Sequence, residues 1–242
     1  MLAWQDVLQR YRRSVIGQFW ITISMGVLIL CLGFLFGVLF KTPHEQFVPF
    51  LAAGLIFWMF ISNTINDSGL AFIGSSNIIR QIALPGLVFV LRVVWRNIIV
   101  LAHNLAILPL LALYLGVPLS LEVFLFIPGL LLLSLNLIWS SYLIGLFCTR
   151  FRDLPQIIQS VLQIFFYITP IIWMPNLLEG RSEFYFIEAN PFYHLIEIVR
   201  APLLGAAPSF TNWFVSVLLL CCGSAITLLF AQKYKHRIAY WL

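Results

Sequence analysis

Three arginines near the start of the chain have the type and spacing to bind phosphate. Arg10, Arg12 and Arg13 lie within four positions, with the aromatic residues Trp4 and Tyr11 beside and among them. A guanidinium presents paired N–H donors that match phosphate oxygens, and aromatic rings favour the depth of lipid headgroups. Two interpretations stay open: the arginines anchor a membrane segment, or they also bind an anionic headgroup such as a lipid pyrophosphate.

A second set of polar side chains lies in an apolar stretch further along the chain. The set comprises Gln156, Gln159, Gln163, Tyr167 and Pro170, with Phe165 and Phe166 beside it. Intervals of three or four residues place the glutamines on one face of a helix. Amides in a bilayer are costly unless they face protein or water. Two interpretations follow. The amides form hydrogen bonds between helices, or, together with Phe166 and Tyr167, they line a conduit in which they bind sugar hydroxyls.

The composition decides in which solvent these side chains lie. Of 242 residues, 62% are hydrophobic and only 10% are charged, against about 25% charged in soluble domains. The mean hydropathy is +0.99. We therefore expect an all-α integral membrane protein that forms one transmembrane domain over residues 1–242.

Six stretches are apolar and long enough to cross a bilayer, which takes about 20 residues. They lie at about 19–40, 47–66, 93–115, 121–148, 156–175 and 212–232. With six spans, eleven of the 14 lysines and arginines fall on the side of the two termini. Since positive charge marks the cytoplasmic side, both termini are expected in the cytoplasm. The net charge of +5 then reflects topology, and no nucleic-acid partner is expected.

Three segments outside these spans have patterns of their own. In residues 1–18 the apolar and aromatic positions recur at helical spacing, which predicts an amphipathic helix in the cytoplasmic interface. Residues 67–92 contain a short helix that ends near Pro85 and is either a docking element or a plain interfacial helix. Residues 176–211 contain amphipathic pieces too short to span, which predicts re-entrant helices outside the cytoplasm.

Motifs for catalysis are absent from the sequence. It contains no G-x-x-x-x-G-K-[ST] loop for ATP, no G-x-S-x-G motif, no carboxylate pair and no cluster of metal ligands. The four cysteines lie in apolar stretches, which is typical of small helix residues. His194 is a lone histidine, to which we assign no catalytic role. Because few charges lie mid-membrane, any uphill transport would draw its energy from another chain.

Several motifs, in order along nearly the whole chain, resemble the membrane permeases of polysaccharide ABC exporters. These are RYRRSVIGQFW at 10–20, NIIRQIALP at 77–85, FRDLPQIIQSVLQIFFYITPIIW at 151–173 and ANPFYHLIEIVRAPLLG at 189–205. The last motif most resembles the O-antigen branch. One departure is that little chain precedes Trp4, where relatives often carry a longer cytoplasmic start.

The resemblance implies a partner, a substrate and a cellular location. It implies a homodimer in the bacterial inner membrane with two ATPase subunits, which bind ATP and magnesium, while this chain carries no cofactor. The substrate would be undecaprenyl-pyrophosphate-linked polysaccharide, most readily O-antigen; capsule or teichoic acid is the alternative, or a drug or lipid for an exporter of the same superfamily.

The resemblance also assigns roles to named residues. The lipid pyrophosphate would meet Arg10, Arg12, Arg13, Trp4 and Tyr11. The conduit would be lined by Gln156, Gln159, Gln163, Phe166 and Tyr167. The ATPase would dock on Asn77, Ile79, Arg80 and Pro85, and the outer gate would consist of Phe192, Tyr193, His194 and Arg200.

Two other classes of function explain the sequence less well. A membrane-embedded transferase for lipid-linked sugars would need paired carboxylates at the cytoplasmic face, but Asp6, Asp67 and Asp153 are spread over three segments. An ion channel would need a repeated filter or a ring of charge, and the sequence has neither.

Overall fold

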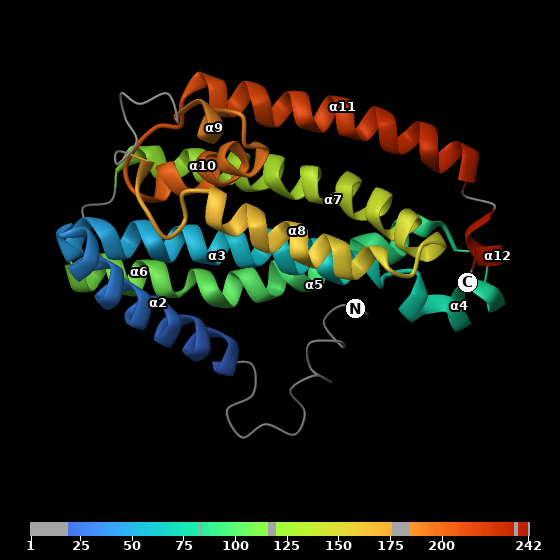
Figure 1. Ribbon diagram of the computed structural model, residues 1–242, viewed down its shortest axis with the longest axis horizontal. Helices are drawn as coiled ribbons and strands as arrows, with labels where there is room; N and C mark the ends of the chain where they lie inside the picture. The colour runs from blue at the N-terminus through green and yellow to red at the C-terminus, as the bar shows by residue number, and fades with distance from the viewer. Residues whose placement is uncertain (1–18, 83, 116–119, 176–183, 235–236, 242) are drawn as a thin grey trace.

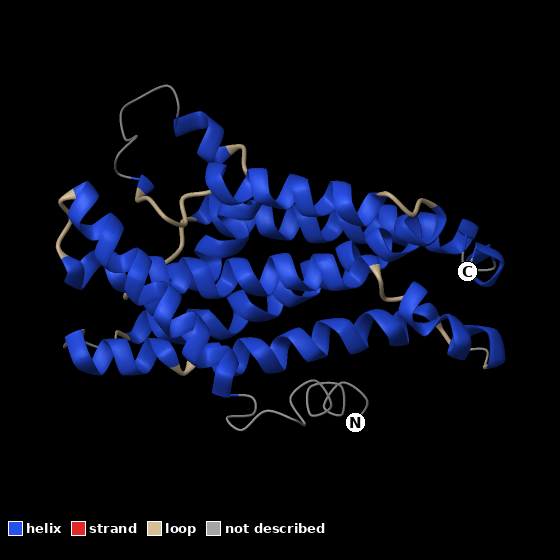
Figure 2. Cartoon of the chain, turned by 60° about the horizontal axis from the view of Figure 1, so that its bottom comes forward, coloured by secondary structure: helices blue, strands red, loops and turns tan. Residues whose placement is uncertain are grey.

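The structure is a bundle of helices. The computed structural model describes residues 19–82, 84–115, 120–175, 184–234 and 237–241, and every regular element within these ranges is helical (Figures 1 and 2). The predicted interface helix at 1–18, with its three arginines, Trp4 and Tyr11, lies outside the described residues. The prediction of an all-helical membrane protein is confirmed for the part described.

Five helical stretches are long and apolar enough to cross a membrane. They are α2 (Phe19–Phe40), α3 (His44–Gly69), α5 (Gly86–Leu105) with α6 (Ile107–Leu115), η2 (Leu121–Leu125) with α7 (Phe126–Arg150), and α11 (Phe210–Tyr234). The break between α5 and α6 falls at Ala106. It has a local cause, because Pro109 lacks an N–H and its ring excludes the carbonyl of Leu105.

The third of these stretches begins earlier than the sequence predicts. Helix α5 starts at Gly86, seven residues before the expected start at 93. The expected range 93–115 already contains Arg96, whose guanidinium pairs with Asp67 of α3 at 2.8 Å and is accommodated inside α5. The helix also takes in residues 86–92. The predicted coupling segment at 67–92 therefore shrinks to residues 70–85, which contain η1 (Ile73–Ser75) and α4 (Ser76–Gln81).

The predicted fifth span is shorter than expected. Helix α8 (Leu154–Ile168) has 15 residues, or about 22 Å at ~1.5 Å per residue, against about 30 Å of hydrocarbon. It ends because Pro170 forces the preceding residue out of the helical region, and Thr169 is extended at φ −77° and ψ 134°. The predicted fifth span at 156–175, which would bring the number of spans to six, therefore stays a prediction.

Two helices lie in the segment between α8 and α11. They are α9 (Phe184–Glu188) and α10 (Pro191–Leu203). The Asn190 side chain caps α10 by accepting a hydrogen bond from the Phe192 N–H at 3.0 Å, and Pro191 occupies the first helical position. With 13 residues, α10 is too short to span a bilayer.

Helix α3 is the centre of the bundle. In its most apolar window 78% of the residues are buried, against 17–28% in the other four spans. It packs against α2, α5, α7, α8 and α10. Figure 1 shows α4 and α12 (Ile238–Trp241) at one end of the bundle and α9 with α10 towards the opposite end.

Helices α7 and α10 approach so closely that only glycine fits between them. A Cβ atom at Gly129 of α7 would overlap the backbone carbonyl of Ile198 in α10. Small residues at such crossings let helix backbones meet in membranes. Gly129 therefore fixes where the buried helix α10 lies against α7.

We predict that Gly129→Ala displaces α10 and destabilises the protein by about 1–3 kcal/mol, the usual cost of overpacking. Thermal unfolding of the purified protein in detergent should show a clearly lower midpoint. Gly26→Ala in α2 is the matched control, since a Cβ there meets no described atom within 4 Å. Equal midpoints for the two variants would contradict the close crossing.

Candidate functional site

A buried arginine joins three parts of the bundle. Arg200 of α10 is 0% exposed. Its Nη1 donates to the carbonyl of Pro170 at 2.7 Å, where the chain leaves α8, and its Nε donates to Glu197 Oε2 at 3.0 Å. The guanidinium also stacks on Phe50 of α3, 4.0 Å from the ring centroid. One side chain therefore connects α10, the end of α8 and α3.

These contacts compensate the charge of Arg200. A buried charge is tolerated when it is paired and its donors are satisfied. Glu197 supplies the counter-charge and is bonded through both Nε and Nη2. The Pro170 carbonyl is available because the helical hydrogen-bond ladder ends at Ile168. The guanidinium is thus a structural tie.

Further hydrogen bonds connect α10 to its neighbours. The His194 Nε2 donates to the carbonyl of Glu188 at 2.7 Å, and its Nδ1 lies 2.8 Å from Asn212 Oδ1 in α11. Asn190 Nδ2 donates to the Thr169 hydroxyl at 2.8 Å. Both ring nitrogens of His194 are therefore engaged, as expected for a structural histidine.

The four residues predicted for the outer gate all lie in α10. They are Phe192, Tyr193, His194 and Arg200. His194 and Arg200 are buried, whereas Phe192 and Tyr193 are half-buried. Phe192 packs against Trp58 and Phe165 with centroid distances of 5.5 and 4.9 Å. The structure therefore packs these side chains into the bundle, and their role as a gate stays a prediction.

The predicted conduit residues lie on the outer face of α8. Gln156, Gln159, Gln163 and Tyr167 are exposed, and Phe166 is half-buried against Trp58. The opposite face of α8 packs inward through residues such as Leu162. Within the described part of the chain, no hydrogen bond involves the three glutamine amides. The helices that the structure describes therefore supply no hydrogen-bond partner for these amides.

The predicted coupling residues lie at the end of the bundle that holds α4. Asn77 and Arg80 are exposed, and Pro85 immediately precedes α5. Ile79 is half-buried and packs against an apolar cluster that includes Phe72. The sequence interpretation missed three exposed apolar residues of this segment: Ile78 (39% exposed), Ile82 (55%) and Leu84 (43%).

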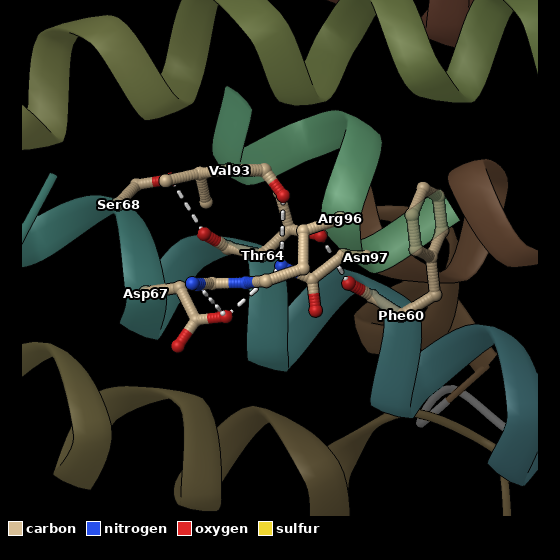
Figure 3. Close-up of polar contacts among 7 residues, drawn as sticks. All are labelled: Phe60, Thr64, Asp67, Ser68, Val93, Arg96 and Asn97. Atoms are coloured by element: carbon tan, nitrogen blue, oxygen red, sulfur yellow. Dashed lines mark hydrogen bonds and ion pairs between the residues drawn. The ribbon is translucent and has the colours of Figure 1, made fainter. Parts of the chain in front are cut away.

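The sequence interpretation also missed a polar cluster between α3 and α5. Figure 3 shows Arg96 and Asn97 of α5 directed at Asp67, two residues before α3 ends. Arg96 Nη2 and Asn97 Nδ2 lie 2.8 and 3.0 Å from Asp67 Oδ2. The sequence signal that could have revealed the cluster is an acidic residue, Asp67, and a basic residue, Arg96, in two neighbouring apolar stretches. The cluster ties α5 to α3 directly beside the segment that carries α4.

Among the described residues, no three His, Cys, Asp or Glu side chains gather to hold a metal ion. The buried polar groups of α10 and the cluster at Asp67 are structural ties, whereas the residues predicted for the conduit and for coupling lie mostly exposed on α8 and in and beside α4. Five helical stretches long and apolar enough to cross a membrane, joined by such polar ties, are the framework on which these surfaces lie.

The comparison with protein families identifies the class. The chain belongs to the ABC-2 type transporter family: residues 1–204 match the sequence profile of that family. It is 25% identical over 232 residues to the O-antigen export system permease protein RfbA of Myxococcus xanthus, covering 93% of this chain and 89% of that protein. It is 23% identical over 254 residues to the RfbA permease of Klebsiella pneumoniae, covering 97% and 91%.

We predict that Arg200→Met destabilises the protein by about 3–5 kcal/mol, because Glu197 and the Pro170 carbonyl lose their partner inside the bundle. Arg200→Lys should lie between the wild type and Arg200→Met, since an ammonium keeps the charge and loses the fork. Thermal unfolding in detergent measures both. Arg152→Met is the control, because Arg152 is exposed; an equal loss there would rule out a special role for Arg200.

Proposed function

We propose that this chain is the permease subunit of an ATP-driven exporter of lipid-linked polysaccharide, with O-antigen as the preferred substrate class. The single observation that carries the proposal is the match to relatives named O-antigen export system permease over nearly their full length. The apolar helices and the family of the chain support a permease of an ABC transporter.

The proposed topology has six spans, with α8 and the residues after it as the fifth, and with both termini in the cytoplasm of a bacterium. Charge supports this orientation. The end of the bundle with α4 and α12 carries Arg80, Arg150, Arg152, Lys233 and Arg237. The end with α10 carries Lys41 and the buried Arg200. Positive charge concentrates on the cytoplasmic side of membrane proteins.

The energy of transport is proposed to come from two ABC ATPase subunits, which bind ATP and magnesium. Helix α4 is the proposed docking element. Its exposed surface combines the apolar Ile78 and Ile82 with the polar Asn77 and Arg80, a mixture typical of interfaces with an apolar centre and a polar rim. Movement of α4 would pass to α3 and α5 through Asp67 and Arg96.

The path of the polymer is proposed to lie along α8 in a homodimer. The exposed amides of Gln156, Gln159 and Gln163 need polar partners in a membrane, and sugar hydroxyls would supply them. Tyr167, 62% exposed, offers a ring face to the C–H groups of a sugar. The undecaprenyl pyrophosphate would enter at Arg10, Arg12 and Arg13, and α10 would act as the outer gate.

We predict that Ile78→Glu on α4 lowers co-purification of the ATPase subunit about fivefold or more, because a charge would lie in an apolar contact. Affinity purification of the tagged permease from mild detergent, with the ATPase quantified per permease, measures the effect. Leu121→Glu is the control, since Leu121 is 82% exposed and belongs to η2, which packs on α10. Unchanged co-purification of the Ile78 variant would contradict docking on α4.

We predict that a photo-crosslinking amino acid at Gln163 captures glycan during active export. The same residue at Leu229 of α11, which is 68% exposed, is the control for collisions at the lipid surface. The expected result is a ladder of glycan adducts at Gln163, several times stronger than at Leu229 and lost when ATP is removed. Capture of no polymer at Gln163 would contradict the conduit along α8.

A further inference from the structure

A pocket lies between the ends of α7, α11 and α12, at the same end of the bundle as α4. Its volume is about 280 Å³, near the lower end of the range of small-molecule sites, which is about 300 Å³. Helix α7 contributes Phe147 and Arg150, α11 contributes Phe230 and Tyr234, and Trp241 lines it from α12. Apart from the contribution of Arg150 to the charge that supports the topology, none of the roles proposed above uses these residues.

The rim of the pocket carries two arginines stacked on aromatic rings. The Arg150 guanidinium lies 5.2 Å from the centroid of the Trp241 ring and 5.4 Å from that of Phe151. The guanidinium of Arg237 lies 5.9 Å from the Tyr234 ring. Stacking holds the planes of the guanidinium groups while leaving their N–H edges available. The N–H groups of both arginines are thus available at the rim to donate hydrogen bonds to a ligand.

The two arginines lack an acidic partner among the residues that the structure describes. The ion pairs found there are Arg96 with Asp67 and Arg200 with Glu197. Arg150 and Arg237 are instead exposed, and two like charges at the rim of one pocket favour an anion between them. Bidentate binding to the oxygens of a phosphate suits such a pair.

The inner wall of the pocket is apolar and open to the side. Phe147 and Phe230 pack against each other with a centroid distance of 5.5 Å, and each is 37% exposed. The neighbouring Leu228 and Leu229 on α11 are 62% and 68% exposed. The apolar wall thus belongs to two of the candidate membrane-spanning stretches, and α11 carries further exposed leucines next to it in sequence. Aromatic and cationic groups lie at the rim of the pocket, where membrane proteins place them at headgroup depth.

We propose that this pocket binds one anionic phospholipid, with the phosphate of its headgroup between Arg150 and Arg237 and its acyl chains over Phe147 and Phe230. The polarity of the pocket matches that of a lipid: cations and rings at the rim, phenyl groups along the wall. A soluble phosphate compound would use the same arginines but would leave the apolar wall unfilled.

The site also has a structural consequence. Helix α12 contacts both α7 and α4, and Trp241 and Arg237 belong to the pocket. A bound lipid would therefore hold α12 against α7 at the end of the bundle where α4 is exposed. The inference does not depend on the polysaccharide as substrate.

The test is lipid retention by the purified protein. Wild type and Arg150→Gln/Arg237→Gln are reconstituted in nanodiscs of phosphatidylglycerol and phosphatidylcholine, exchanged into detergent, and analysed by native mass spectrometry. We expect the wild type to retain phosphatidylglycerol selectively and the double variant to retain about tenfold less, as two charge-assisted contacts are lost. Arg80→Gln/Arg152→Gln is the control, which removes two exposed arginines at the same end of the bundle outside the pocket.

Two further arms keep the outcome interpretable. Arg150→Lys/Arg237→Lys preserves the charges but loses the forks, so it should retain clearly more lipid than the glutamine variant and less than the wild type. An equal thermal unfolding midpoint for wild type and both variants separates loss of binding from misfolding. Millimolar inorganic phosphate is added to the wild type before detergent exchange and should not displace the lipid. Equal lipid loss in the control variant, or displacement by inorganic phosphate, would overturn the proposal.

Discussion

The burial of Arg200 is the constraint on which the arrangement of the bundle depends. A guanidinium removed from water needs a counter-charge and partners for its N–H groups. Glu197 comes from the same helix, but the Pro170 carbonyl and the Phe50 ring come from the end of α8 and from α3. The charge can be satisfied only when these three parts are assembled, so it makes their relative positions specific.

Helix α3 takes part in two polar contacts, one near each of its ends. Phe50 stacks on Arg200, whereas Asp67 pairs with Arg96 beside the segment of α4. At ~1.5 Å per residue the two positions lie about 25 Å apart along the helix. Hydrogen bonds and ion pairs between helices add to the packing that holds them together in a membrane. Helix α3 is therefore the element able to relate motion at one end of the bundle to the other.

The sequence predicts much of this fold because local signals decide it. Composition and run length predict five of the spans, and Asn190 followed by Pro191 marks the start of α10. The errors concern contacts between distant segments. No local pattern reveals that Arg96 pairs with Asp67, which lies in another helix. Likewise, no local pattern reveals that the buried guanidinium of Arg200 is satisfied by the carbonyl of Pro170, 30 positions away.

The polar residues discussed above fall into two groups, which differ in where their hydrogen-bond and charge partners lie. Those of α10 and the cluster at Asp67 find their partners inside the bundle, so they specify the fold. The glutamines of α8 and the arginines at the rim beside Trp241 face outward, and no carboxylate of the described chain pairs with those arginines. Outward polar groups in a membrane are costly until something else binds them. The partners of this chain, whether a second copy, a polymer or a lipid, therefore belong on these outer faces rather than in its core.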